Sequence, residues 1–234
     1  MIAVNIVGYK KTGKTTLAVA LGQELARRGV RAAAAKFTHQ PEADAPGTDS
    51  HALRQAYGRV ALLAGEATGL FWQGRRHLPD LVPLLDADVL VVEGGKHLGW
   101  LPRILLLRSV ADAGELEQGL ALASAGQVPG YGLEHVPDVS ALADLILARG
   151  FALPGLDCGS CGRPDCAALA REIVAGKATA ADCRAAGSAV EVTVNGQPLA
   201  MNAFVQGVFS GAVTGMLRQF KGYAPGTVEI RLKG

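Results

Sequence analysis

The chain has 234 residues, of which 49% are hydrophobic, 19% charged and 5% aromatic, and its formal net charge is +2. This composition is typical of a folded protein and excludes a disordered chain. The near-neutral charge gives no sign of the basic surface that nucleic-acid binding needs, so no nucleic-acid partner is expected. Apolar runs are too short for a membrane span and the first residues lack a basic leader, so we expect a cytoplasmic protein without membrane contact.

Short apolar runs alternate with amphipathic stretches up to about residue 150, which predicts an α/β fold with a mostly parallel sheet. The expected strands cover residues 2–7, 30–37, 60–64, 69–72, 89–93, 104–108 and 120–124. Helices are expected over 15–28 and 139–149, each followed by a glycine. Residues 38–50 contain two prolines and three acids, which predicts a loop at the sheet rim where such folds bind ligands.

The remaining sequence predicts two smaller units after a linker at about residues 151–156. A cysteine-rich segment contains a helix over 167–174 that ends at Gly176. The turn signal Asn195-Gly196 predicts a hairpin over 189–200, followed by a helix that begins at Asn202 and ends near residue 220, and by a strand over 227–232. An apolar stripe on that last helix predicts a core face. The expected domains are residues 1–152, 153–187 and 188–234.

Residues 8–15, Gly-Tyr-Lys-Lys-Thr-Gly-Lys-Thr, fit the pattern GxxxxGK[ST] between the first strand and the first helix. This pattern in this context predicts a P-loop, in which backbone N–H groups and the helix N-terminus bind phosphates. Lys14 then neutralises the β- and γ-phosphates, and the hydroxyl of Thr15 is a ligand for Mg²⁺. The predicted nucleotide-binding residues of this loop are Gly8, Tyr9, Lys10, Lys11, Thr12, Gly13, Lys14, Thr15 and Thr16.

A P-loop also needs an acidic side chain that holds Mg²⁺ or orders the attacking water. Glu93 ends an apolar strand and is therefore expected at the rim beside the phosphates, as a Mg²⁺ ligand and, with Lys14, as a catalytic residue. Asp49 is either a second acid near the metal or the N-cap of the next helix, and the sequence favours neither. No guanine-specific Asn-Lys-x-Asp motif is present, so the residues leave the base undetermined.

Four motifs occur in order: residues 7–17 around the P-loop, Lys-Phe-Thr-His at 36–39, Pro-Gly-Thr-Asp-Ser at 46–50 and Val-Glu-Gly-Gly-Lys at 92–96. Residues 1–150 thereby resemble the MobB family of molybdopterin-guanine dinucleotide biosynthesis. The resemblance implies a GTP-binding, usually dimeric protein that assists the attachment of GMP to molybdopterin in molybdenum or tungsten enzymes. It implies Mg²⁺ near Asp49 and Glu93, Lys96 at the same rim, and a nucleotidyltransferase or molybdoenzyme as partner.

The cysteines Cys158, Cys161, Cys166 and Cys183 have the spacing C-x2-C-x4-C-x16-C within one short segment. A tight trio with one distant fourth ligand suits a [4Fe–4S] cluster better than zinc, which usually takes two C-x2-C pairs. Zinc and free thiols remain alternatives. The segment also resembles the small four-cysteine iron–sulfur domain of electron-transport subunits and corrinoid proteins, which implies that all four cysteines bind one cluster.

These features together predict a GTP-binding maturation factor that carries a [4Fe–4S] cluster and hydrolyses GTP slowly unless a partner completes the site. The alternative is a nucleotide-driven electron-transfer protein in which the cluster is the redox centre. Against it, reductases of the nitrogenase iron-protein type have a lysine after the first P-loop glycine, where this chain has Tyr9. A binding adaptor without turnover is a third possibility.

Overall fold

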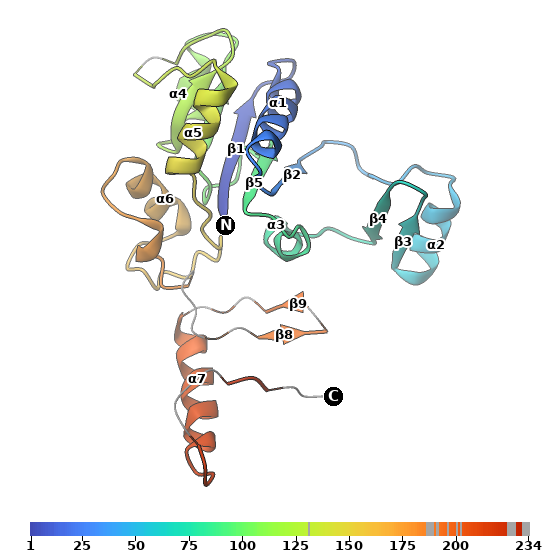
Figure 1. Ribbon diagram of the computed structural model, residues 1–234. Coiled ribbons are helices and arrows are strands. Elements are labelled where there is room, and N and C mark those ends of the chain that lie inside the picture. Colours follow the sequence, from blue (N-terminus) through green and yellow to red (C-terminus); the bar gives the residue numbers. More distant parts are fainter. Residues whose placement is uncertain are drawn as a thin grey trace.

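The computed structural model describes residues 1–130, 132–185, 190, 192–195, 197–199, 201, 203–223 and 228–230. Its centre is a five-stranded, fully parallel sheet in the order β2-β5-β1-β6-β7 (Figure 1). The strands are β1 (Ile2–Gly8), β2 (Ala32–Lys36), β5 (Val89–Glu93), β6 (Arg103–Leu106) and β7 (Ala121–Ala125). The predicted α/β fold is therefore confirmed.

Helices cover both faces of this sheet because its buried strands are apolar on both sides. On one face α1 (Lys14–Arg27) and α5 (Val139–Arg149) bury Leu21, Leu25, Leu142 and Ile146 against β1, β5 and β6. On the other face lie α4 (Asp112–Leu116), α3 (Leu78–Leu81) and the adjoining 3₁₀ turn η1 (Val82–Leu84). Gly29, with a φ of 72°, follows the end of α1 as predicted.

Two of the predicted strands do not join the sheet. β3 (Arg59–Leu63) and β4 (Thr68–Trp72) form an antiparallel pair of their own, and α2 (Asp49–Tyr57) packs on β3. Figure 1 shows α2, β3 and β4 as an arm joined to the sheet by two extended connections, apart from α1 and α5. We call residues 49–72 the arm. The βα pattern did not distinguish these strands from those of the sheet.

The cysteine segment, residues 153–185, has a small hydrophobic core of its own. It contains α6 (Cys166–Val174) and the 3₁₀ turn η2 (Ala180–Asp182), and Gly176 follows α6 with a φ of 71°. Leu169 and Ala170 of α6 pack with Leu153 and with Leu120, the residue directly before β7 of the sheet. Trp100 contacts both this cluster and the cluster under α3, so the two parts share packing.

The C-terminal residues form the predicted hairpin and helix, but not every feature predicted for them is observed. β8 (Thr193–Val194) pairs antiparallel with β9 (Gln197–Pro198), and α7 (Ala203–Leu217) follows. The expected core stripe of α7 is wrong, since Phe204 is 77% and Val208 57% exposed. The cap Asn202, the turn residue Gly196 and the ends of the strand over 227–232 lie outside the described residues, and the described residues 228–230 are not in a strand.

Membrane spanning has no support in the described part of the chain. No helix there is both long enough and apolar enough to pass through a bilayer.

Arg103 is a fully buried cation on β6 that has no carboxylate partner among the described residues. Its guanidinium donates to the carbonyl oxygens of Lys96 (2.6 Å) and Leu98 (3.2 Å) in the β5–β6 loop, and of Leu116 (2.6 Å) in α4. Burial lowers the pKa of Arg103, yet a guanidinium stays charged in proteins. Three carbonyl dipoles thus stabilise one charge, and the charge fixes the loop to α4.

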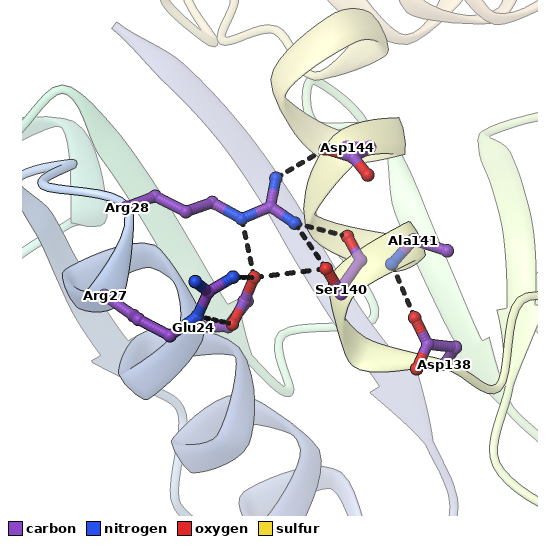
Figure 2. A network of polar contacts seen from close by, with 7 residues as sticks. All are labelled: Glu24, Arg27, Arg28, Asp138, Ser140, Ala141 and Asp144. Atoms are coloured by element: carbon purple, nitrogen blue, oxygen red, sulfur yellow. Dashed lines mark hydrogen bonds and ion pairs between the residues drawn. The ribbon is translucent and has the colours of Figure 1, made fainter.

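α1 and α5 are joined by a polar network on their outer surface (Figure 2). Glu24 accepts hydrogen bonds from Arg27 (2.8 Å) and Arg28 (2.7 Å), and Ser140 of α5 donates to it at 3.2 Å. Arg28 also bonds the Asp144 carboxylate and the carbonyl of Ser140. The hydrogen bonds from Arg27, and then from Arg28, lower the pKa of Glu24 from 4.5 to about 2.

We expect the stabilisation from Glu24 to depend on pH. A lowered pKa in the folded state stabilises the fold above the unfolded-state pKa near 4.5, and this stabilisation disappears as pH falls toward 2. The urea midpoint of Glu24→Gln should therefore lie below that of the unchanged chain at pH 7, and the gap should narrow by pH 3. Glu66→Gln, in the exposed turn of the arm, is the control. A gap that is constant with pH would contradict the assignment.

Arg103→Met should lower the free energy of unfolding by about 3 kcal/mol, because buried carbonyls lose their donor. Arg31→Met is the matched control, since Arg31 makes only exposed ion pairs with Asp86 and Asp88. Arg31→Met should lower the free energy of unfolding by less than about 1 kcal/mol. Urea unfolding of both variants measures the difference, and equal losses would show that Arg103 contributes no more than a surface arginine.

Candidate functional site

The predicted P-loop joins β1 to α1 at the carboxyl edge of the sheet. Gly13 is the N-cap of α1 with a φ of 86°, and Lys11 also has a positive φ of 66°. A side chain at Gly8 would place its Cβ 2.5 Å from the carbonyl oxygen of Leu106 and 2.6 Å from the hydroxyl of Thr12. Only glycine fits there, so the loop backbone passes close to the end of β6.

Lys14 points back over the loop and donates to the carbonyl oxygen of Tyr9 at 2.6 Å. Thr12 donates to the same oxygen at 3.0 Å. Partial burial lowers the pKa of Lys14. The charge of Glu93 acts in the opposite direction, whereas the charges of Lys96 and Lys36 lower this pKa further. An anion at the loop would relieve this repulsion, so the lysine is placed to exchange a neutral carbonyl for a phosphate oxygen.

The predicted pair Thr15 and Glu93 is brought into contact. The Thr15 hydroxyl donates to Glu93 Oε1 at 2.9 Å, although the two residues are far apart in the chain. Lys36, the last residue of β2, lies 3.1 Å from Glu93 Oε2 and 3.3 Å from the Thr15 hydroxyl. These three side chains come from α1, β5 and β2, because parallel strands all end at one edge. A hydroxyl beside a carboxylate is the oxygen pair that Mg²⁺ takes in P-loop proteins.

Tyr9 lies between two cations at the same rim. Lys96 Nζ is 3.7 Å and Arg108 Cζ 4.0 Å from the centre of its ring, both within the range of cation–π contacts. The Tyr9 hydroxyl also bonds the Glu115 carboxylate. Together with Lys14 and Lys36, these residues give the rim an excess of positive charge, which suits a polyphosphate.

Backbone contacts fix the loop that carries Lys96. Asn5, fully buried on β1, donates from Nδ2 to the carbonyl oxygen of Gly95 at 3.2 Å. Gly94 and Gly95 have positive φ values of 85° and 65°. With the bonds from Arg103, these contacts fix the course of the loop that leaves β5 after Glu93.

Asp49 is not brought to this rim. It is the first residue of α2, and the N-cap is Thr48, whose hydroxyl accepts from the His51 N–H at 3.3 Å. Figure 1 shows α2 in the arm, apart from α1 and β5. His39 is exposed in the loop after β2, as are Lys10 and Lys11 in the P-loop and Thr16 in the first turn of α1.

Three residues of this region were missed by sequence reasoning. Lys36 ends an apolar strand exactly as Glu93 does, which was an available signal. Arg108 follows β6 at the same edge, and only the sheet order reveals that it meets Tyr9. Arg103 is charged within a strand, and nothing in its spacing predicts its carbonyl partners.

The four cysteines lie around the small core of the cysteine segment. Cys166 and Cys183 are buried in it, and Cys158 and Cys161 pack against it. Gly159 and Gly162 have φ values of 67° and 81°, and the backbone N–H of Asp157 donates to Cys166 Sγ at 3.4 Å. The four thiols are free, and an N–H directed at sulfur with turns of this kind suits an iron–sulfur cluster.

The sulfurs are not gathered to metal-binding distance. Among the residues that the structure describes, no three His, Cys, Asp or Glu side chains form a group that is able to hold a metal ion. Burial raises the pKa of Cys166, whereas a hydrogen bond with Ser160 lowers that of Cys158. The four thiols around one small core are the donors that an iron–sulfur cluster takes, so the donor chemistry fits a cluster.

Comparison with known proteins identifies both parts of the chain. The family model "Molybdopterin guanine dinucleotide synthesis protein B" (MobB) matches residues 3–125, and the model "Putative Fe-S cluster" matches residues 153–185. Both resemblances drawn from the sequence motifs are thereby confirmed.

Two curated proteins are similar to this chain. One, from Methanocaldococcus jannaschii, is a "Putative molybdopterin-guanine dinucleotide biosynthesis adapter protein", 24% identical over 99% of this chain and 97% of its own length. The other, from Escherichia coli K12, is a "Molybdopterin-guanine dinucleotide biosynthesis adapter protein", 32% identical over 59% of this chain and 87% of its own length. The first relative therefore extends along nearly the whole chain, the cysteine segment included.

Solved structures agree on the fold. The crystal structure of Bacillus subtilis MobB matches with a TM-score of 0.52 and 21% identity, covering 64% of this chain and 99% of that one. A second structure, of molybdopterin-guanine biosynthesis protein B, gives 0.52 and 22%, with 63% and 97% covered. The chain belongs to the MobB family.

Proposed function

We propose that this protein is a GTP-binding accessory protein of molybdenum or tungsten cofactor maturation, which assists the formation or delivery of molybdopterin guanine dinucleotide. The observation that carries the proposal is the meeting of Lys14, Thr15 and Glu93 at the P-loop of a MobB-family chain. The names of the two curated relatives support the adapter role. Nucleotide-driven electron transfer is not favoured, because the relative that matches along 99% of the chain is named as a putative molybdopterin-guanine dinucleotide biosynthesis adapter protein.

In this proposal each rim residue has a defined task toward GTP and Mg²⁺. Lys14 leaves the Tyr9 carbonyl and binds the β- and γ-phosphates, while Thr15 and Glu93 hold Mg²⁺. Lys36 pairs with Glu93 and holds at the rim the carboxylate that would be a Mg²⁺ ligand. Glu93 is the candidate residue for activating water. Hydrolysis is slow until a partner, such as a cofactor nucleotidyltransferase or a molybdoenzyme, completes the site.

The proposal includes a homodimer formed through the arm. Leu62, Leu63 and Leu70 of β3 and β4 are exposed, and an isolated two-stranded sheet is marginally stable in water. A second copy of the chain would cover these side chains. The proposed domains of each copy are residues 1–152, 153–187 and 188–234.

We further propose that Cys158, Cys161, Cys166 and Cys183 bind one [4Fe–4S] cluster. The spacing supports it, as do the shared core around the four residues and the N–H group directed at Cys166. When bound, the cluster supplies one-electron redox chemistry. The residues of the segment provide its thiolates and exclude water from its buried side.

The nucleotide site is tested by titrating the protein with GTP and with ATP in the presence of Mg²⁺ by calorimetry. GTP should bind more tightly than ATP, and Lys14→Ala should weaken GTP binding by at least about 100-fold, since two charge-assisted contacts of about 1.5–3 kcal/mol each are lost. Lys177→Ala removes an exposed lysine of the cysteine segment and should bind GTP normally. Tighter binding of ATP, or an unaffected Lys14→Ala, would contradict the proposal.

The cluster is tested by measuring iron, acid-labile sulfide and zinc in protein purified without oxygen. We expect about four irons and four sulfides per chain, the content of one [4Fe–4S] cluster, and their loss in Cys166→Ser. The chain has no fifth cysteine for a matched control, so Lys177→Ala, which changes an exposed side chain of the same segment and keeps all four thiols, serves instead. One zinc and no iron per chain would contradict the cluster and indicate a structural zinc site.

A further inference from the structure

A cavity of about 450 Å³ lies between the nucleotide-binding domain and the cysteine segment. Its walls come from four separate stretches: Phe37 after β2, residues 75–79 before and within α3, residues 97–100 of the β5–β6 loop, and residues of the cysteine segment between 155 and 167. The volume is within the range of sites for small organic ligands. Neither the P-loop motif nor the four-cysteine motif accounts for this cavity.

One side of the cavity is aromatic. The ring of Phe37 meets the ring of His97 edge-on at 5.3 Å, and Trp100 lines the wall beside them. Gly155, with a φ of 65°, lies against the Trp100 ring, since a Cβ there would be 2.9 Å from the indole nitrogen. The three rings give this wall an aromatic, apolar surface, and aromatic rings pack against a planar heterocycle either edge-on or with offset faces.

Another side is cationic. Arg75, Arg76 and His77 lie in the connection between β4 and α3, and none of them forms an ion pair with another residue in the part of the chain that the structure describes. Arg76 lies over the ring of Trp72, 5.9 Å from its centre. Two guanidinium groups without carboxylate partners at the mouth of a cavity suit a phosphate.

The wall from the cysteine segment carries two carboxylates. Asp157 accepts from the backbone N–H of Cys166 at 2.8 Å, and Asp165 accepts from that of Ala168 at 2.6 Å. Each carboxylate has further acceptor positions, which are able to take N–H and amino groups of a heterocycle. The cavity therefore combines an aromatic wall, acceptors for ring donors and cations for a phosphate.

We propose that this cavity binds a phosphorylated pterin. A pterin is a planar bicyclic ring with N–H and amino donors, and a terminal phosphate is what a nucleotide must join to form a pterin dinucleotide. The inference rests on the proposed function, since it names the second substrate class of the same protein. It adds that the cysteine segment builds part of the pterin site.

The position of the cavity supports this assignment. Phe37 follows Lys36 and His97 follows Lys96, so the cavity begins one residue beyond two cations of the nucleotide rim. On the opposite wall, Ala167 follows Cys166 and contacts Gly99, where an added Cβ would lie 2.7 Å from the Ala167 side chain. A pterin phosphate in the cavity is thus adjacent to both the nucleotide rim and the cysteines.

Trp100 provides a direct readout, because the chain has only two tryptophans. In the full-length Trp72→Phe variant, 6-hydroxymethylpterin monophosphate should quench the remaining Trp100 fluorescence in a saturable manner. Arg75→Ala with Arg76→Ala should weaken this binding at least tenfold, because the phosphate loses its charge-assisted bonds. Arg27→Ala with Arg31→Ala removes two exposed arginines elsewhere and should leave the affinity unchanged.

Further arms separate the possible ligands. Unphosphorylated 6-hydroxymethylpterin should bind at least tenfold more weakly, and GMP should compete poorly. Absence of saturable quenching, equal affinities in the two double variants, or equally tight binding of GMP would overturn the pterin assignment.

Lys14→Ala distinguishes this inference from the proposed function. It should weaken GTP binding by at least about 100-fold and leave quenching by the pterin phosphate intact. Pterin phosphate binding without GTP binding in the unchanged protein would overturn the proposed function alone, and the reverse result would overturn the pterin site alone.

Discussion

The buried guanidinium of Arg103 is the interaction on which the functional region depends. It has no carboxylate partner in the described structure, so its charge is stabilised by the carbonyl oxygens of Lys96, Leu98 and Leu116. A buried cation tolerates few other arrangements, because each lost acceptor leaves charge without compensation in a region of low dielectric. The β5–β6 loop therefore has one course, and both the rim and the cavity wall are built on it.

The parallel sheet supplies the second constraint, since all its strands end at one edge. Glu93, Lys36 and the P-loop converge there from β5, β2 and β1. Four of the side chains gathered at the rim are cations, and repulsion from Lys36 and Lys96 helps to lower the pKa of Lys14. A rim that concentrates like charge in this way attracts an anion, and Lys14 already donates to an oxygen atom there, the Tyr9 carbonyl.

The P-loop and Glu93 were predictable from sequence because both are set by local order: a strand, a glycine-rich turn and a helix, or a carboxylate that ends an apolar run. Asp49 was not resolved, because its place depends on whether β3 and β4 join the sheet, and hydrophobic alternation is the same in an arm and in a sheet. Lys36 and Arg108 act through neighbours distant in the chain, so their partners follow from strand order, which spacing does not contain.

The packing of Trp100 gives a physical reason for joining a nucleotide-binding domain to a cysteine segment. Trp100 belongs to the hydrophobic clusters of both parts, and Gly99 beside it touches Ala167, the residue after Cys166. The loop that carries these two residues begins at Glu93. Gly155 and Asp157 line the cavity on the same short stretch of chain that carries Cys158, and Gly155 lies against the Trp100 ring. The cysteine segment and the nucleotide-binding domain therefore share one packed surface, and the wall of the cavity is part of it.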